Sequence, residues 1–194
     1  GSIMQTFRVP DDAELLQFDW NYLSEEFLEF IDSIYQDPFQ VTLTSGEGTE
    51  EVLYLTVDGI AQDYGADYCR SDVNPPYQCI LEGNSGNLLP ISPQIVFDRG
   101  DVWMTGWQSC VYDISHLQGQ VVTLTFLAED EGDTIYDTAV LLDSIRIGTE
   151  AVFDRYSLSI NALSGGAVPP KQGNYRHDPG ASVTVEANPA AGYE

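Results

Sequence analysis

Lysine and arginine are scarce in this chain, which has only 7 of them against 31 aspartate and glutamate residues in a length of 194. The formal net charge of −24 gives a surface that repels phosphate backbones and anionic lipid headgroups. Nucleic acids and membrane surfaces are therefore disfavoured as partners. The same acidity is typical of halophilic or marine proteins, and of proteins that bind hard cations through carboxylate oxygens.

Long apolar runs and catalytic motifs are also missing. No stretch of 18 apolar residues occurs, so the sequence predicts no membrane insertion by this segment. The motifs HExxH and GxSxG and a phosphate-binding glycine loop are absent. A Ser-His-Asp triad in the first domain would depend on His116, whose neighbours Asp113 and Ser115 are adjacent only in sequence. We predict that the chain is not an enzyme, and a carbohydrate-active enzyme with two catalytic acids is the least favoured alternative.

Cysteine is limited to three residues, Cys69, Cys79 and Cys110. The stretch CRSDVNPPYQC has the form of a polar loop closed at its ends. In a secreted protein we expect a Cys69–Cys79 disulfide, with Cys110 left over. Pairing of Cys110 with either of the others, or three reduced thiols, are the alternatives. The opening Gly-Ser resembles a cloning remnant, so export is inferred without a visible signal peptide.

What the sequence does contain is a period-two alternation of apolar and polar residues, which indicates β-strands. In LLQFDWNYL, Leu16, Phe18, Trp20 and Tyr22 share one face. Four more segments have the same β-branched and aromatic bias: FQVTLTSG, EVLYLTVDG, QVVTLTFLAED and TAVLLDSIRIG. Such strands with long loops between them predict an all-β fold, an antiparallel jelly-roll β-sandwich. Residues 24–36 are expected to form a loop or one or two helical turns.

A change in composition near residue 150 divides the chain. Residues 1–150 contain the predicted sandwich. Residues 151–194 bring short strands, small residues and four of the ten prolines, which predicts a small C-terminal β module. Within the first domain, residues from about 58 to 95 are expected to form an elaborated loop, because they hold the cysteine pair, adjacent prolines and several glycines.

Carboxylates crowd the segment before and within the strand at 138–148. Asp143 lies in an apolar run whose two faces are both expected to be covered, and a buried carboxylate is costly unless it is paired, protonated or bound to a metal. Because cationic side chains are scarce, we predict calcium, which takes six to eight oxygen ligands. The candidate ligands are Glu25, Glu26, Asp133, Asp137 and Asp143. The alternative is a hydrated acidic turn, with Asp143 satisfied by backbone N–H groups.

Aromatic side chains are the candidate contacts for a polysaccharide, because their flat rings stack on sugar rings. Trp103 and Trp107 flank a Thr-Gly turn, and Tyr68 and Tyr77 lie in the cysteine loop. Packing onto the sandwich is the alternative for each of them. Trp20 is assigned to the core, because it alternates with core residues.

Three segments, FDWNYLSEEFLEFIDSIYQDPFQVTL, TGWQ and YDISHLQGQVVTLTFLAEDEGDTIYDTAVLLDSIRI, resemble the choice-of-anchor domains of secreted bacterial surface proteins. The resemblance covers about residues 5–148. It implies a jelly roll, an extracellular or cell-surface location and a non-catalytic role, and analogy with calcium-bearing carbohydrate-binding jelly rolls favours a structural ion. The tail, GGAVPP followed by YRHDPGASVTVEANPAAGYE, is similar to the start of a divergent internalin-type B-repeat, a spacer module.

We therefore expect a non-catalytic, extracellular, calcium-binding module of a bacterial surface or secreted protein, used for adhesion or polysaccharide binding. A ligand-free structural spacer domain is the alternative.

Overall fold

The computed structural model describes residues 1–66, 85–91, 97, 102–132 and 135–151, together with the backbone of four short strands between 156 and 189. The chain divides into two compact units, Gly1–Ala151 and Val152–Glu194. The division lies next to the boundary expected at residue 150. The predicted disulfide and site residues that fall outside the described part are Cys69, Cys79, Tyr68, Tyr77 and Asp133.

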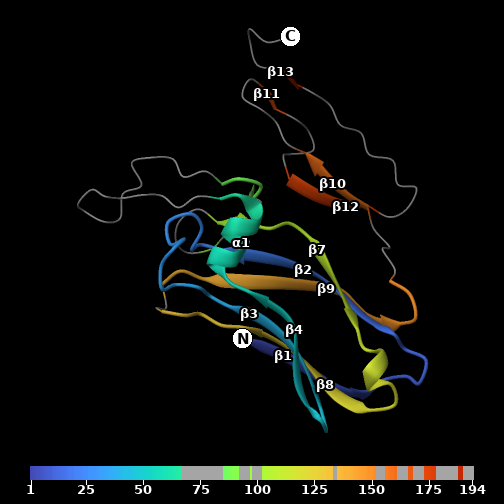
Figure 1. Cartoon of the computed structure of the whole chain (residues 1–194). Helices are drawn as coiled ribbons and strands as arrows, with labels where there is room; N and C mark the ends of the chain where they lie inside the picture. Colours follow the sequence, from blue (N-terminus) through green and yellow to red (C-terminus); the bar gives the residue numbers. More distant parts are fainter. Residues whose placement is uncertain are drawn as a thin grey trace. The chain divides into compact units, whose positions relative to one another are not determined.

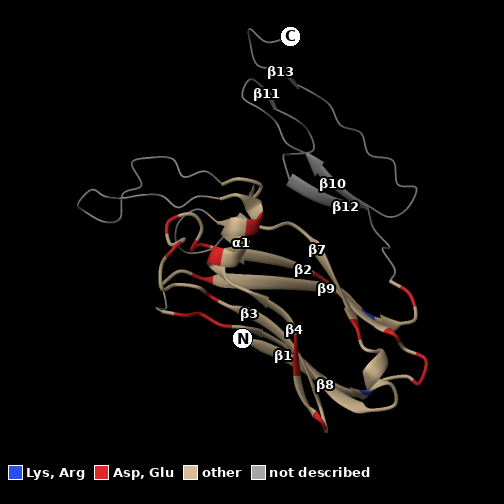
Figure 2. Ribbon diagram, in the orientation of Figure 1, with Lys and Arg blue, Asp and Glu red and all other residues tan. Residues whose placement is uncertain are grey.

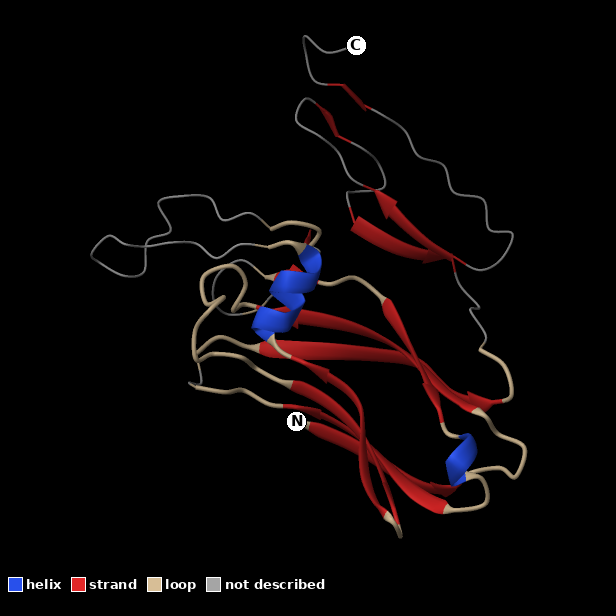
Figure 3. Cartoon of the chain, in the orientation of Figure 1, coloured by secondary structure: helices blue, strands red, loops and turns tan. Residues whose placement is uncertain are grey.

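Two antiparallel sheets build unit 1 (Figure 1, Figure 3). The first sheet has the order β1-β8-β3-β4. Its strands are β1 (Ser2–Arg8), β8 (Val121–Ala128), β3 (Phe39–Ser45) and β4 (Gly48–Leu55). All neighbours in this sheet are antiparallel. Both outer strands, β1 and β4, pair with a single described strand, so each is an edge of the sheet.

The second sheet is organised around β2 (Leu15–Ser24), the strand with the clearest alternation in the sequence. It pairs with β9 (Thr138–Gly148) on one side, and with β7 (Gln108–Asp113) and β6 (Trp103–Met104) on the other. The short strand β5 (Leu89–Pro90) pairs with β6. The predicted all-β antiparallel sandwich is confirmed, and β7, β8 and β9 alternate between the sheets as in a jelly roll.

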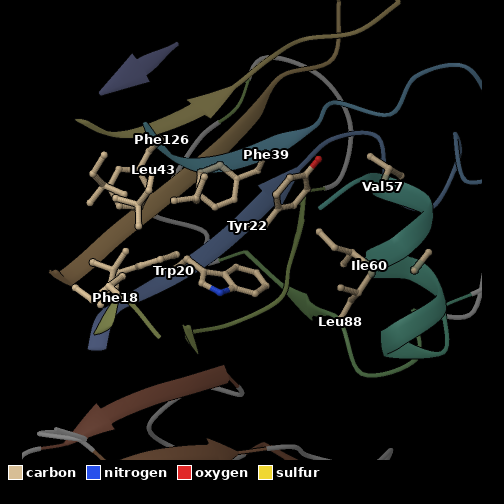
Figure 4. Close-up of a cluster of buried hydrophobic side chains, with 14 of the residues drawn as sticks. Phe18, Trp20, Tyr22, Phe39, Leu43, Val57, Ile60, Leu88 and Phe126 are labelled. Atoms are coloured by element: carbon tan, nitrogen blue, oxygen red, sulfur yellow. The ribbon is translucent and has the colours of Figure 1, made fainter. Parts of the chain in front are cut away.

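The core forms between the sheets because β2 turns its apolar face toward β3 and β8. Phe18 of β2 meets Phe126 of β8 edge-on, with ring centroids 5.1 Å apart and planes at 88°. Phe126 also stacks on Phe39 of β3 at 6.5 Å (Figure 4). Edge-on aromatic pairs add about 0.5–1.5 kcal/mol to the stabilisation from area burial alone. Aromatic contacts therefore help to hold the two sheets together.

A helix, α1 (Val57–Tyr64), occupies the beginning of the segment expected to be a loop at 58–95, which corrects that expectation. Thr56 caps its first turn, with the side-chain oxygen accepting a hydrogen bond from Gly59 N at 3.2 Å. Gly65 ends it at φ 66°, a left-handed conformation in which glycine has no steric penalty. The apolar side of α1 packs onto the core beside Tyr22 (Figure 4).

Other elements agree with or differ from the expectations in detail. Residues 25–36 form turns, as expected. The segment around His116 contains the short 3₁₀ helix η1 (Ser115–Leu117). The opening residues Ser2–Arg8, which the alternation had not singled out, form the edge strand β1. No helix within the described ranges is long and apolar enough to cross a membrane.

Unit 2 contains short antiparallel strand pairs, in keeping with a small β module. β10 (Tyr156–Ile160) pairs with β12 (Gly173–His177). β11 (Gly166–Ala167) pairs with β13 (Asn188–Pro189).

Candidate cation site at one end of the sandwich

Three buried acidic residues lie at the end of the sandwich where β2 and β8 end and β3 and β9 begin. Glu25 and Glu26 follow β2 directly, Asp37 precedes β3, and each is at most 1% exposed. We call these three residues the carboxylate cluster. Residues 9–69 and 100–145 contain no Lys or Arg, and acidic segments surround this end of unit 1 (Figure 2). The local field is therefore strongly negative.

Asp37 fastens the segment between β8 and β9 to the sandwich. Its Oδ1 accepts a hydrogen bond from Glu131 N at 2.8 Å, and its Oδ2 accepts one from the Thr138 hydroxyl at 2.6 Å. Its carbonyl oxygen accepts a third, from the Tyr22 hydroxyl at 2.7 Å. The backbone of Asp37 has φ 38°, a conformation that Asp and Asn tolerate better than other non-glycine residues.

Glu25 makes a second attachment to the same segment. Its Oε2 accepts a hydrogen bond from Asp137 N at 2.9 Å, while Glu25 N donates to Asp137 O at 3.2 Å. Glu26 N donates to the Ser24 hydroxyl, which lies 2.7 Å from the Thr138 hydroxyl. The structure thus brings three of the predicted ligands, Glu25, Glu26 and Asp137, to one end of the sandwich. Both hydrogen bonds between Glu25 and Asp137 use the backbone of Asp137, and residue Asp137 is exposed.

Tyr22 reports on the electrostatics of the cluster, because its phenol lies among these acids. Burial raises the pKa of Tyr22 far above its usual range, and the negative charges of Asp37 and Glu26 raise it further. The hydrogen bond with Thr138 acts in the opposite direction. Tyr22 therefore stays a neutral hydrogen-bond donor.

Asp143, the fifth predicted ligand, lies away from the carboxylate cluster. Thr138 is opposite Ser24 in the β2–β9 register, whereas Asp143 is opposite Asp19. Five residues of strand separate the two positions, a distance of about 17 Å. Asp143 and the cluster therefore cannot share one ion without a large rearrangement.

The expectation that both faces of this strand are covered is wrong. Leu141, on the same side of β9 as Asp143, is 41% exposed, and Ile145, within the register shift that follows Asp143, is 49% exposed. The physical reason is that β9 is an edge strand, paired with β2 alone among the described strands. Asp143 is half-buried, and its Oδ1 accepts a hydrogen bond from Ser144 N at 2.7 Å. A backbone N–H group therefore satisfies part of the hydrogen-bonding capacity of the Asp143 carboxylate. The alternative without a metal predicts this kind of contact.

The donors of the carboxylate cluster have the chemistry that calcium requires, since all of them are oxygen atoms. Oε2 of Glu26 is buried and accepts no hydrogen bond within the described part of the chain. Glu26 makes other interactions. Within the described ranges, no three His, Cys, Asp or Glu side chains are already arranged to hold a metal ion. A bound ion would thus require the cluster side chains to turn toward one another.

The predicted aromatic contacts are only partly accessible. Trp103 is half-buried in β6 and packs against the core, which matches the packing alternative. Trp107 is half-buried and precedes β7. Trp20 is buried in the core, as predicted.

Two features of the described residues were not identified from the sequence. Asp37 directly follows the segment 24–36 and is not among the predicted ligands, and its partner Glu131 is 94 residues away in sequence. His116 contacts Glu50, with Nε2 and Oε1 2.8 Å apart, and the Tyr112 hydroxyl donates to the same carboxylate at 3.1 Å. The first arrangement depends on the pairing of β3 with β8, and the second joins residues from the two different sheets. The only local signal was an acid beside a proline in a stretch without Lys or Arg.

Comparison with protein families, curated proteins and solved structures finds no match for the chain.

Proposed function

We propose that the chain is a non-catalytic, extracellular β-sandwich module of a bacterial surface or secreted protein. In this proposal calcium stabilises the module and adhesion or polysaccharide binding is its task. The observation that carries it is the burial of Glu25, Glu26 and Asp37 together, in segments that contain no Lys or Arg.

Electrostatics supports the proposed cation. Moving carboxylates out of water is costly, and like charges in one place raise that cost further. Hydrogen bonds from Glu131 N, Asp137 N and the Thr138 hydroxyl offset part of it. A divalent ion bound to Glu25, Glu26 and Asp37 would offset more, because it neutralises charge and replaces lost hydration with direct oxygen ligands.

A ligand-free spacer is the second candidate, and a specific observation favours it. Both carboxylate oxygens of Asp37, and Oε2 of Glu25, already accept hydrogen bonds. The cluster could therefore act only as a clamp on the segment between β8 and β9.

Calorimetric titration of calcium into chelator-treated protein separates the two candidates. The calcium-binding proposal predicts a saturable heat with a dissociation constant of millimolar or below. Glu26→Gln should weaken binding at least tenfold, whereas Glu47→Gln, in the exposed turn between β3 and β4, should leave it unchanged. The absence of saturable heat, or equal binding by the Glu26→Gln variant, would favour the spacer.

Polysaccharide binding is tested separately by pull-down with insoluble glycans and a glycan array, with calcium present. Recognition predicts retention that Trp107→Ala reduces while the melting temperature is maintained. The matched control is Tyr54→Ala, which removes an exposed aromatic ring from β4. If no glycan retains the protein, the polysaccharide part of the proposal fails, while the calcium part is judged by calorimetry alone.

A further inference from the structure

Over residues 2–7, the edge strand β1 lacks the usual protection against pairing with another strand. Edge strands are normally shielded by charged side chains, prolines or bulges. The opposite edge of the same sheet, β4, carries Glu50 and Glu51, and its register with β3 shifts between Val41 and Thr42. By contrast, the first six residues of β1, Ser2–Phe7, contain no charge, proline or glycine, and its one charged residue, Arg8, is the last of the strand and pairs with Asp11. Its register with β8 is unbroken.

The hydrogen bonds at the two ends of β1 show which backbone groups face outward. Ala128 N donates to Gly1 O at 2.9 Å, and Val9 N donates to Gln120 O at 2.9 Å. In an antiparallel pair with an unbroken register, bonding toward the partner falls on alternate residues. The odd-numbered residues of β1 therefore bond to β8. The even-numbered residues Ser2, Met4 and Thr6 direct their N–H and C=O groups toward the open edge.

A groove of about 420 Å³ lies next to this edge, between β1 and β9. Its apolar lining comes from both sheets and includes Ile3, Phe39, Phe126, Val140 and Leu142. Ile3 is opposite Phe126 in the register, so it belongs to the inner face of its sheet, yet it is 64% exposed. An added strand beside β1 would place alternate side chains over this lining and close the open side of the sandwich.

The charge around the groove selects the kind of strand that fits. Glu129, Asp130 and Asp137 line it near the Ser2 end of β1, and the one positive group among the lining residues is the Gly1 ammonium, which donates to Ala128 O. A second copy of this chain, with its own net charge of −24, would be repelled. A strand with Lys or Arg at the end that meets Glu129 and Asp130 would be attracted.

We propose that β1 and the adjacent groove bind an extended segment of another protein by β-strand addition. The segment pairs with Ser2, Met4 and Thr6 through its backbone. It places alternate apolar side chains over Ile3 and Phe126, and a basic residue against Glu129 and Asp130. Main-chain hydrogen bonds give the affinity in this mode of recognition, and the alternate side chains give the specificity.

Selection from a library of random twelve-residue peptides, using the whole chain as target, tests this proposal. The expected peptides alternate apolar and polar residues and carry Lys or Arg near one end. N-methylation of alternate residues, which removes the pairing N–H groups, should weaken a selected peptide at least tenfold when measured by fluorescence anisotropy. Met4→Pro should have a similar effect, because Met4 N–H faces the open edge and not β8.

Charge variants provide the matched control. Asp130→Lys should weaken the selected peptides several-fold at low salt, whereas Glu47→Lys, with the same change in net charge, should not. If Met4→Pro does not fold, Ile3→Asp and the N-methylated peptides decide the question. A failure to select peptides, or peptides that bind equally after N-methylation, overturns the proposal. So does a dimer of the chain alone that Met4→Pro abolishes, because the edge would then bind a second copy.

Discussion

At the scale of single residues, the polar groups inside unit 1 are organised around Tyr22. Its hydroxyl donates to the carbonyl of Asp37, whose carboxylate in turn accepts from Thr138 and Glu131. Buried polar groups cost little when they are hydrogen-bonded and much more when a partner is removed. The stability of this end of the sandwich therefore depends on individual hydrogen bonds as well as on apolar packing.

Tyr22→Phe should lower the free energy of unfolding by about 1–3 kcal/mol, because it leaves the buried carbonyl of Asp37 without its donor. Urea denaturation monitored by tryptophan fluorescence measures the change. Tyr54→Phe, which removes a hydroxyl from an exposed ring, should change it by less than about 0.5 kcal/mol. Equal effects of the two substitutions would contradict the importance of the buried hydrogen bond.

Cys110 should react slowly in the folded protein. Burial raises the pKa of its thiol from 9.0 to about 11. At pH 8 this leaves about a hundredfold less of the reactive thiolate than an ordinary thiol has. Alkylation by iodoacetamide, followed by peptide mass mapping of Cys110, should therefore be about a hundredfold slower in buffer than in urea. Similar rates in both conditions would refute the effect of burial.

The same pKa shift predicts how stability depends on pH. The unfolded chain releases the Cys110 proton near pH 9, before the folded protein does near pH 11. The contribution of the buried thiol to stability is therefore complete below pH 9 and is lost as the pH rises to about 11. Cys110→Ala should remove this part of the alkaline dependence in urea denaturation.

At the scale of elements, strands were more predictable than connections. The residues of β2, β3, β8 and β9 show their alternation locally, so their positions could be read from the sequence. The helix α1 was missed although Thr56 and Gly65 are a cap and a stop, because it has only 8 residues and contains Gly59. The edge position of β9 was also missed, since the neighbours of a strand in a sheet are not encoded in its own periodicity.

The segment between β8 and β9 should depend on Asp37 for its order. Asp37→Ala removes the acceptors of Glu131 N and the Thr138 hydroxyl, and it places a side chain of ordinary steric demand at φ 38°. We expect a loss of about 3 kcal/mol or more, measured in chelator so that metal binding does not contribute. Hydrogen exchange at Glu131 and Asp137 should become faster, while exchange in β3 changes less.

Asp37→Asn is the matched variant for this experiment. Asparagine keeps one carbonyl acceptor and tolerates the left-handed region, so its effect should be smaller than that of alanine. If alanine and asparagine cost the same, the loss of negative charge, and not the loss of the acceptors, would be the dominant effect.

At the scale of the whole molecule, the amino-acid composition predicted the net negative charge but not the position of the carboxylate cluster. The scarcity of Lys and Arg was plain from the sequence, and so was the crowding of acids before β9. The sequence could not show that Asp37 joins Glu25 and Glu26, or that Asp143 lies about 17 Å away, because strand register fixes both. Local patterns thus predicted the class of fold, and long-range pairing decided the arrangement of the acids.

The net charge of −24 should make stability sensitive to ionic strength. Screening weakens the repulsion between carboxylates, and it does so more in the compact folded state. Raising NaCl from low to about 0.5 M in the presence of chelator should stabilise the protein by about 1 kcal/mol, or about 2–4 °C in melting temperature. KCl should give the same shift. A melting temperature that falls with salt would mean that attractive charge pairs outweigh repulsion.

The most direct test of the calcium-stabilised sandwich is a pair of thermal melts at equal ionic strength, one in chelator and one in millimolar calcium. A ligand that binds only the folded state at a hundred times its dissociation constant adds about 2.7 kcal/mol of stability. We therefore predict a rise in melting temperature of roughly 5–10 °C, reduced or absent in the Glu26→Gln variant. Superimposable melts with and without calcium would contradict the account and would leave the carboxylate cluster as a hydrogen-bonded clamp.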